Sequence, residues 1–167
     1  MNSGTLLQIN RSPGGMPKRA IEGPVMLGRL GVEGDKHRNT MVHGGPNKAV
    51  LMVSAEFIDG LAARGFPVFY GAIGENLTVS GLDPHLWRRG QRWRIGDDVI
   101  IELTSLRTPC ANLHVFSPAI KAELYDEQCE EGDVSSPHWA HGGFYARVIR
   151  EGLLFAGAPV VLESDLA

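Results

Sequence analysis

The sequence predicts a mainly β fold, a β-barrel with a few peripheral α-helices, and three observations support this. The 167 residues include 21 glycines and 10 prolines, a composition that favours many turns between short elements. Several short segments alternate apolar and polar residues, which is the pattern of a half-buried strand. Helical segments are few, and they do not alternate with strands as in a βαβ array. We also expect a single domain over residues 1–167, because neither a linker nor an internal repeat divides the chain.

Short strands account for most of the predicted structure. The clearest is Val99–Thr104, in which Val99, Ile101 and Leu103 point to one face and the residues between them to the other. Glu151 and the glycine after it predict a turn before the last strand. The expected strands are Thr5–Asn10, Val50–Val53, Val99–Thr104, Phe144–Arg150 and Pro159–Glu163, with a possible further strand at Leu77–Val79.

Two longer helices are expected outside the barrel. The first is capped by Ser54, runs to about Arg64 and ends at Gly65, because serine can bond the free amides of a first turn and glycine terminates helices. The second is capped by Ser117 and runs to about Gln128, with proline at its first helical position.

Composition and charge argue against some classes of partner. The formal net charge is −3, the isoelectric point is about 6.1 and 7% of residues are aromatic. Nucleic-acid binders normally carry a basic excess or aromatic platforms for bases, so nucleic acid is not the expected partner. The local exception is a basic cluster within residues 87–94, between a proline-containing turn and a strand. We interpret it as a solvated loop or as the wall of an anion site, and it comprises Arg88, Arg89, Arg92 and Arg94.

The two cysteines, Cys110 and Cys129, are too few for a disulfide framework in a chain of this length. Cys129 lies in an acidic stretch that disfavours a thiolate, and we expect it to be inert. No apolar stretch reaches the roughly 18 residues that a membrane span requires, and the N-terminus lacks the pattern of a signal peptide. We therefore expect a cytoplasmic protein with free thiols and no membrane association.

The segment Gly28–Pro46 holds five glycines and shows no helical or strand period. A structureless stretch of this length inside a domain is usually functional or disordered. It contains three candidate site residues, Asp35, His37 and His43, whose role the sequence leaves open. They can stabilise the loop by hydrogen bonds, contact an anionic or pterin-like ligand, or ligate a metal, although their spacing matches no zinc pattern.

Glu75 and Asn76 follow a glycine in the segment Gly71–Gly81 and precede the possible strand. Asparagine in a tight turn is often structural, because it tolerates a left-handed conformation and bonds its own backbone. The residues alone therefore favour a structural role for this pair.

Cys110 closes the segment Arg107-Thr108-Pro109-Cys110, which directly follows the clearest strand. We expect it at a strand end, before a short helical turn, because proline holds the preceding residue extended. Helix-start amides and a nearby guanidinium favour the thiolate, the form that binds metals and attacks sulfur. A lone cysteine is also commonly a small buried hydrophobe. A thiol–imidazole pair with His43 or His114 is a third possibility.

Six segments form an ordered set along the chain: GVEGDKH (residues 31–37), HGGPNKAV (43–50), GENLT (74–78), IGD (95–97), RTPC (107–110) and GGFYARV (142–148). The set resembles the molybdenum-cofactor sulfurase C-terminal (MOSC) domain family, particularly its small stand-alone bacterial members. The resemblance covers about residues 5 to 163. Each motif is weak alone, but six in order at plausible spacing are specific.

The resemblance implies a barrel with a cofactor cleft lined by the glycine-rich loops. It implies that Cys110, at the family's signature cysteine, ligates molybdenum or carries a sulfane sulfur as persulfide. It also implies that Arg107 and the His43–Gly45 turn contact the pterin or its phosphate. The cofactor-binding candidates carried over, either for contact or for the architecture of the cleft, are Arg107, His43, Gly44, Gly45, Asp35, His37, Glu75 and Asn76.

Proteins similar to this one reduce N-hydroxylated bases and amines with a pterin-bound molybdenum. The resemblance thus implies a molybdenum–pterin cofactor (molybdopterin), a small N-hydroxylated substrate and a separate electron-donor protein. Two cysteines cannot supply the four thiolates of an iron–sulfur cluster, and the length leaves no room for a pyridoxal-phosphate desulfurase domain, so neither cofactor is expected. The alternatives are a sulfur carrier or cofactor-binding protein without its own turnover, and a cysteine-nucleophile transferase.

Overall fold

Alternating apolar residues form the inner face of the central strands, as the sequence predicts. The computed structural model describes residues 2–37 and 44–164. In β8 (Val99–Leu106), Val99, Ile101 and Leu103 are fully buried, whereas the residues between them are partly exposed. The remaining predicted strands are present as β1 (Ser3–Arg11), β5 (Val50–Ser54), β6 (Leu77–Ser80), β9 (Phe144–Arg150) and β11 (Pro159–Ser164).

Five further strands, of two to four residues each, are too short to show a clear period, and the sequence did not predict them. They are β2 (Arg19–Ala20), β3 (Val25–Gly28), β4 (Gly31–Val32), β7 (Arg92–Ile95) and β10 (Gly152–Leu154). Three predictions are wrong as a result. The segment Gly28–Pro46 contains β4, which pairs with β3, and Gly152 begins a strand. Arg92 and Arg94 lie in a strand of the barrel and not in a loop.

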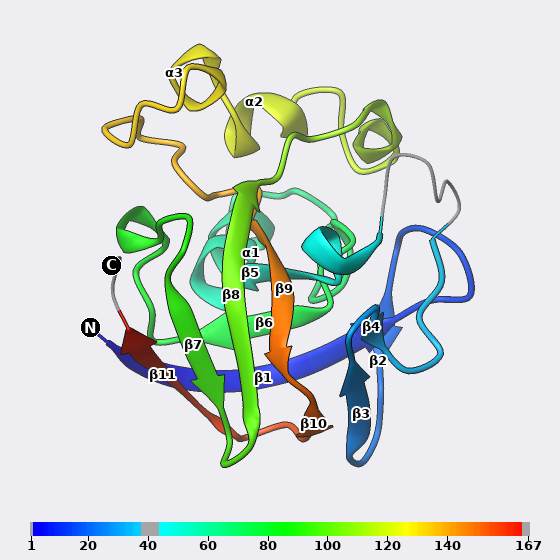
Figure 1. Cartoon of the computed structure of the whole chain (residues 1–167). Helices are drawn as coiled ribbons and strands as arrows, with labels where there is room; N and C mark the ends of the chain where they lie inside the picture. The colour runs from blue at the N-terminus through cyan, green and yellow to red at the C-terminus, as the bar shows by residue number, and fades with distance from the viewer. Residues whose placement is uncertain (1, 38–43, 165–167) are drawn as a thin grey trace.

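Within the described residues, seven strands close into a barrel (Figure 1). Neighbours in the order β11-β7-β8-β9-β5-β6-β1 are hydrogen-bonded, and pairing of β11 with β1 completes the ring. The pair β5–β6 is parallel and the other barrel pairs are antiparallel. β2 continues the sheet beside β1, and β10, β3 and β4 form a separate small sheet. The predicted β-barrel is confirmed.

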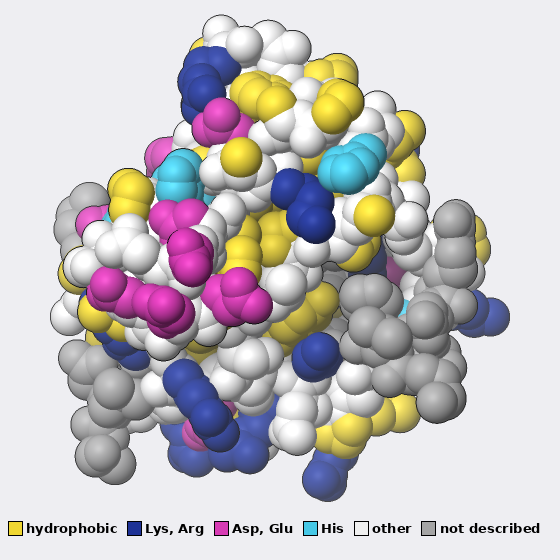
Figure 2. All heavy atoms as spheres, turned by 90° about the horizontal axis from the view of Figure 1, so that it is seen from above, with side chains coloured by type: hydrophobic (Ala, Val, Ile, Leu, Met, Phe, Trp, Pro, Cys, Tyr) yellow, Lys and Arg dark blue, Asp and Glu magenta, His cyan; other side chains and the backbone are white. Residues whose placement is uncertain are grey.

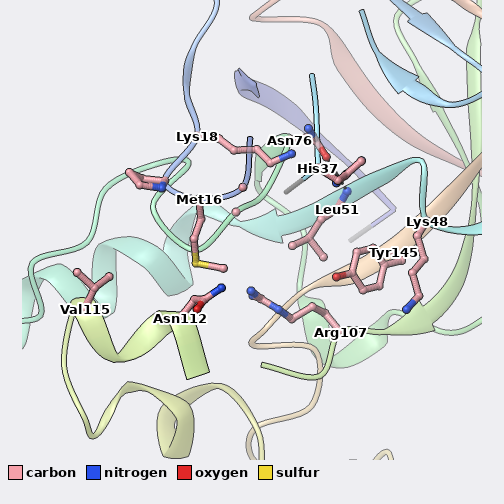
Figure 3. Close-up of a pocket in the computed structure, with 13 residues that line it drawn as sticks. Met16, Lys18, His37, Lys48, Leu51, Asn76, Arg107, Asn112, Val115 and Tyr145 are labelled. Carbon is pink, nitrogen blue, oxygen red and sulfur yellow. Dashed lines mark hydrogen bonds between the residues drawn. The ribbon is translucent and has the colours of Figure 1, made fainter. Parts of the chain in front are cut away.

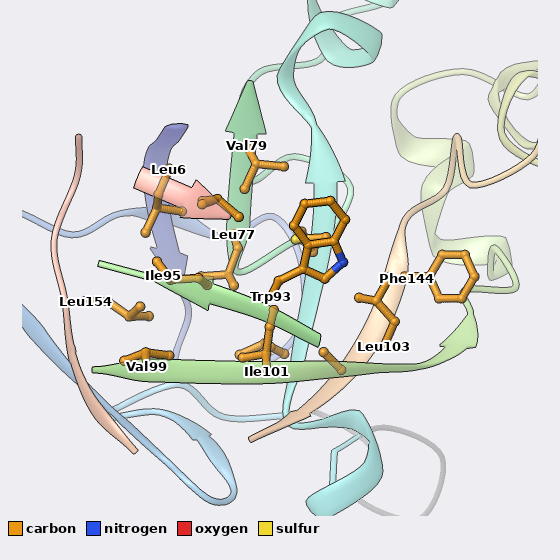
Figure 4. Packing of buried hydrophobic residues seen from close by; sticks show 14 of the residues in the cluster. Leu6, Leu77, Val79, Trp93, Ile95, Val99, Ile101, Leu103, Phe144 and Leu154 are labelled. Carbon is orange, nitrogen blue, oxygen red and sulfur yellow. The ribbon is translucent and has the colours of Figure 1, made fainter. Parts of the chain in front are cut away.

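The interior of the barrel is filled by apolar side chains from strands all around the ring (Figure 4). Burying one such side chain stabilises a fold by about 1.5–3 kcal/mol. The core therefore provides the rigid frame on which the loops at the barrel's ends are held. Its members include Leu6, Leu77, Val79, Trp93, Ile95, Val99, Ile101, Leu103, Phe144 and Leu154.

A second apolar cluster packs helices against the outer side of β5. α1 (Ala55–Ala63) begins after Ser54, whose Oγ accepts a hydrogen bond from Phe57 N at 3.4 Å, and it ends before Gly65, as predicted. β5 is buried on both faces, because Val50 and Met52 belong to the barrel core whereas Leu51 and Val53 lie under the helices. The cluster also contains Ile58, Leu61, Ile73, Leu113, Ile120 and Leu124. It fixes the segment after Cys110 beside β5.

The predicted helix from Ser117 to Gln128 is wrong in its continuity and its cap. The chain forms α2 (Ile120–Leu124) and α3 (Glu127–Glu130), separated by the extended Tyr125. Asp126 accepts a hydrogen bond from Cys129 N at 2.8 Å and so caps a new helix, which competes with continuation of the first. Three short 3-10 helices complete the described residues: η1 (Pro46–Lys48), η2 (Pro84–Leu86) and η3 (Ala111–Val115). None of the helices in residues 2–37 and 44–164 combines the length and apolar character that crossing a membrane requires.

Candidate functional site

A cavity of about 400 Å³ lies at one end of the barrel, where loops from distant parts of the chain meet (Figure 3). This volume falls within the range of about 300–1,000 Å³ that small-molecule sites occupy. Apolar and cationic side chains share its wall. The described residues that line it are Gly15, Met16, Pro17, Lys18, His37, Lys48, Leu51, Gly74, Asn76, Arg107, Asn112, Val115 and Tyr145.

Arg107 forms the cationic floor of the cavity. It follows the last residue of β8, and its backbone N donates to Gly143 O at 2.9 Å. The side chain is 97% buried, with Nη2 donating to Ile73 O at 2.8 Å and Nη1 to Gly142 O at 3.4 Å. Figure 3 shows the guanidinium extending toward Met16 and Asn112. A buried guanidinium bound to carbonyls is held rigidly and keeps its positive charge, which suits it to an anionic ligand.

A buried ion pair forms the opposite wall. Lys18 Nζ lies 2.5 Å from Asp35 Oδ2, and the two side chains are 5% and 3% exposed. Asp35 Oδ2 also accepts a hydrogen bond from Asn76 Nδ2 at 2.9 Å, and Asp35 Oδ1 accepts one from Ser12 N at 2.9 Å. The carboxylate of Asp35 is thus occupied by donors of the protein itself. Its hydrogen bonds hold the loop, which is the first of the three roles that the sequence left open.

Asn76 connects three elements around this wall. Its Oδ1 accepts a hydrogen bond from Leu51 N at 3.1 Å, and its Nδ2 donates to Asn10 O at 3.2 Å as well as to Asp35. Its side chain is therefore fully used in joining β1, β5 and the loop at Asp35. Asn76 lines the cavity, and its side-chain hydrogen bonds are structural. This agrees with the structural role that the sequence around Glu75 and Asn76 favours.

His37 lines the cavity, whereas Gly44 and Gly45, which were predicted as cofactor-binding residues, are not among its lining residues. A Cβ on Gly44, which has φ +86°, would lie 2.6 Å from His37 Cδ2, so only glycine lets the two segments approach. Burial lowers the pKa of His37, the charge of Lys18 lowers it further, and Asp35 opposes both. Gly45 is exposed and caps η1, at whose end Lys48 Nζ lies 5.1 Å from the ring centroid of Tyr145. His43 lies outside the described residues.

Metal ligation by the residues of this loop gains no support from the structure. Among residues 2–37 and 44–164, no group of three or more His, Cys, Asp or Glu side chains is arranged to hold a metal ion. His37 and Asp35 instead contribute a ring and a paired carboxylate to the cavity wall.

Glu75 does not line the cavity, although it was predicted as a cofactor-binding residue. Its side chain is fully buried, Oε1 accepts hydrogen bonds from Gly71 N at 2.6 Å and Thr78 Oγ1 at 3.3 Å, and Oε2 has no partner among the described residues. Burial raises the pKa of Glu75 to about 7, although the backbone hydrogen bonds and the charge of Arg107 act in the opposite direction.

Glu75 should make the protein less stable as the pH rises. Its folded-state pKa of about 7 exceeds the ordinary value of 4.5, so the folded state keeps a proton that the unfolded state loses. The free energy of unfolding should therefore fall by about 3 kcal/mol between about pH 4.5 and pH 7. The Glu75→Gln variant should lose this part of the pH dependence in urea unfolding, whereas the exposed Glu22→Gln should keep it. Equal pH slopes in all three proteins would contradict the assignment.

Cys110 lies at the edge of the cavity. It is half-buried and is not among the lining residues, but Arg107 before it and Asn112 after it both are. It caps η3 and makes no side-chain hydrogen bond there, and the exposed His114 forms no hydrogen bond with its thiol. Cys110 also acts electrostatically on Tyr145, which lines the cavity. Burial raises the pKa of the Tyr145 phenol, the charge of Arg107 lowers this pKa, and Cys110 raises it.

Cys129 differs from Cys110 in its burial and in its side-chain hydrogen bond. Burial raises the pKa of its thiol, and Sγ donates to Ser136 Oγ at 3.3 Å. It lies in α3 and is not among the residues that line the cavity. These observations agree with the expectation that Cys129 is inert.

Several lining residues were not among the sequence candidates. They are Gly15, Met16, Pro17, Lys18, Lys48, Leu51, Gly74, Asn112, Val115 and Tyr145. Lys48 and Tyr145 lie inside the motif segments 43–50 and 142–148, so the motifs carried a signal for them. Lys18 and Met16 follow β1 in a segment with no motif, and only the folded chain brings them to the cavity.

Comparison with known proteins gives a consistent picture. The sequence profile of the MOSC domain matches residues 39–161. The uncharacterized protein YflK of Bacillus subtilis is 33% identical over 153 residues, and protein YiiM of Escherichia coli is 32% identical over 161 residues. These matches cover 90% and 93% of this chain but only 63% and 66% of the two relatives, so the chain spans less than two thirds of their length.

A third relative and two solved structures extend the comparison. A Gibberella moniliformis protein named reductase is 32% identical over 101 residues, which are 58% of this chain and 18% of that one. The crystal structure of Escherichia coli YiiM superposes with a TM-score of 0.68 at 26% identity, covering 98% of this chain and 71% of that one. The crystal structure of YiiM from Geobacillus stearothermophilus gives 0.67 at 25% identity, with coverages of 96% and 75%.

Proposed function

Because the chain belongs to the MOSC domain family, we propose that it binds a molybdenum–pterin cofactor and reduces N-hydroxylated bases or amines with electrons from a separate protein. The observation that carries this proposal is the cavity itself, which joins the buried Arg107 to a half-buried Cys110 at its edge. A third relative that bears the name reductase supports the same class of reaction.

The residues around the cavity fit a ligand of this type. The cofactor combines an anionic phosphate, a flat polar ring system and a metal bound by sulfur. Arg107 and Lys48 would hold the phosphate, and Asn112 would hydrogen-bond the ring. Cys110, which follows Arg107 in the same segment of the chain, would supply a soft thiolate, the ligand type that completes a sulfur-rich metal shell. When bound, the cofactor would supply the electron and oxygen-atom chemistry.

The chain's own residues would bind the substrate and exclude water. Met16, Leu51 and Val115 give the cavity an apolar wall against which a flat base can pack. His37 and the phenol of Tyr145 lie on the same cavity and can donate or accept hydrogen bonds to a hydroxylamine group. The overall reaction breaks the N–O bond: R–NH–OH, two electrons and two protons give R–NH₂ and water.

The proposal is tested by producing the protein in a host that synthesises the cofactor. We expect close to one molybdenum per chain by elemental analysis, together with pterin fluorescence after oxidation. With viologen reduced by dithionite as a small electron donor, the protein should convert an N-hydroxylated purine to the amine. Protein that carries neither molybdenum nor pterin after production in such a host would overturn the proposal.

A further inference from the structure

The basic cluster of Arg88, Arg89, Arg92 and Arg94 divides into two parts in the structure. Arg88 is used internally, because its Nη1 donates to His85 O at 2.6 Å and to Trp87 O at 2.8 Å. The other arginines project from the outer surface of β7 and the turn before it. We define the basic face as Lys48, Arg89, Arg92, Arg94 and Arg147 with the carboxylates of Glu102 and Glu163.

The basic face has a positive excess although the chain as a whole has a formal net charge of −3. Glu102 lies between two guanidiniums, with Arg92 Nε at 2.7 Å and Arg147 Nη2 at 2.5 Å. Arg94 pairs with Glu163 at 2.5 Å. Arg89 is exposed and has no hydrogen bond or ion pair with any of the described residues. The four arginines of the basic face therefore lie beside two carboxylates among the described residues, and Arg89 is exposed to solvent.

This charge is gathered on one side of the molecule. Figure 2 shows Lys and Arg side chains along the lower edge of the view, which is the side of β7, β8 and β9 at the front of Figure 1. Acidic side chains gather elsewhere, over the segment that carries α3. The separation of signs gives the protein one face suited to a negatively charged partner.

A groove of about 360 Å³ connects the basic face to the candidate site. Lys48, Arg89, Glu102, Thr104, Ser105 and Arg147 are among the residues that line it. Lys48 also lines the main cavity, so groove and cavity share one wall. Thr104 Oγ1 donates to Asn47 O at 2.5 Å and ties η1, which carries Lys48, to β8. A molecule seated on the groove would thus lie against the wall of the site.

We propose that the basic face docks the acidic surface of the electron-donor protein. This inference rests on the proposed function, which requires electrons from outside the chain. Arg89, Arg92 and Arg147 are exposed, and Lys48 and Arg94 are half-buried. Cations spread in this way over β7, β9 and the neighbouring turns steer a transient protein partner, which differs from the buried donors of a small-anion site. The described residues of this face include no exposed aromatic side chain on which single-stranded nucleic acid could stack. Electron-transfer partners meet through such small, weak interfaces.

The test uses a reduced acidic flavodoxin as the protein donor and dithionite-reduced viologen as the small donor. The double variant Arg89→Glu/Arg147→Gln should lose about tenfold in kcat/KM with flavodoxin and keep the viologen-driven rate. Arg29→Glu is the control outside the basic face, because it makes the same change as Arg89→Glu at an exposed arginine in the turn between β3 and β4 on the small sheet. It should behave as the wild type with both donors.

Binding measured without turnover separates this proposal from the function proposed above. Wild-type protein should bind flavodoxin at about 0.01 M salt and release it at about 1 M salt. The reason is that the Debye length falls from about 30 Å at the lower concentration to about 3 Å at the higher one. The double variant should bind about tenfold more weakly even if no molybdenum is present. If the wild type, the double variant and Arg29→Glu all lack viologen-driven activity, that result would contradict the proposed reductase function and would leave the docking proposal to be decided by flavodoxin binding. Flavodoxin binding that is absent or equal in all three proteins, or binding of a single-stranded oligonucleotide in its place, would overturn the docking proposal.

Discussion

The Cys110→Ser variant should retain essentially no molybdenum, whereas Cys129→Ser should retain the wild-type amount. Serine differs from cysteine by one atom, so the chain around η3 should keep its conformation. Its hydroxyl remains protonated at neutral pH and is a hard ligand, whereas a sulfur-bound molybdenum favours a soft thiolate. Cys110 is half-buried and lies in the chain between Arg107 and Asn112, which both line the cavity. Molybdenum per chain by elemental analysis gives the readout, and equal melting temperatures would show that both variants are folded.

Cys129→Ser is a suitable control because it makes the same chemical change away from the cavity. Its side chain is buried and bonded to Ser136, and a serine hydroxyl can make the same hydrogen bond. Molybdenum that persists in Cys110→Ser would contradict a metal-ligating Cys110. In that case the sulfur-carrier alternative predicts an additional mass of about 32 Da, one sulfur atom, on the wild type and not on the variant.

Local sequence patterns predicted the strands that have a regular buried face or an apolar run, and the helix whose ends are marked by nearby residues. β8 alternates because Val99, Ile101 and Leu103 all enter the barrel core. α1 was predicted because Ser54 caps it and Gly65 follows its end. β5 is buried on both faces and therefore shows no alternation, yet its run of apolar residues was sufficient. The break between α2 and α3 was missed, because Ser117 is a plausible cap and the competing cap at Asp126 depends on the folded loop.

Within the candidate site, sequence reasoning found the residues that lie in motifs and missed those that only the fold brings there. Arg107, Asn76 and His37, three of the predicted cofactor-binding residues, line the cavity. Glu75 is buried and is not among the lining residues. A motif does not separate a residue that contacts a ligand from one that supports the loop, as Glu75 does through Gly71 N. Lys18 lines the cavity and forms an ion pair with Asp35, which is 17 residues away in the sequence. No local sequence pattern indicates that contact.

The Lys18→Met variant should be destabilised more than any exposed ion-pair variant of this protein. Lys18 and Asp35 are 5% and 3% exposed and lie 2.5 Å apart, so methionine would leave a buried carboxylate with only neutral donors. Breaking a buried pair by removal of one partner costs about 3–5 kcal/mol, a large part of the 5–15 kcal/mol by which typical domains are stable. Methionine matches the length and apolar stem of lysine, so the loss would reflect charge more than packing. Urea unfolding at pH 7 measures it.

Two further variants distinguish an uncompensated charge from other causes of instability. Arg64→Met breaks the pair with Glu123, whose side chains are 58% and 23% exposed, and it should have a much smaller effect because water replaces the lost partner. Lys18→Met combined with Asp35→Asn removes both charges, while the asparagine oxygen can still accept a hydrogen bond from Ser12 N. This double variant should recover most of the lost free energy, because replacing a buried ion pair by neutral groups is often close to neutral. A double variant as unstable as Lys18→Met would show that shape at the cavity wall, and not charge, holds the loop.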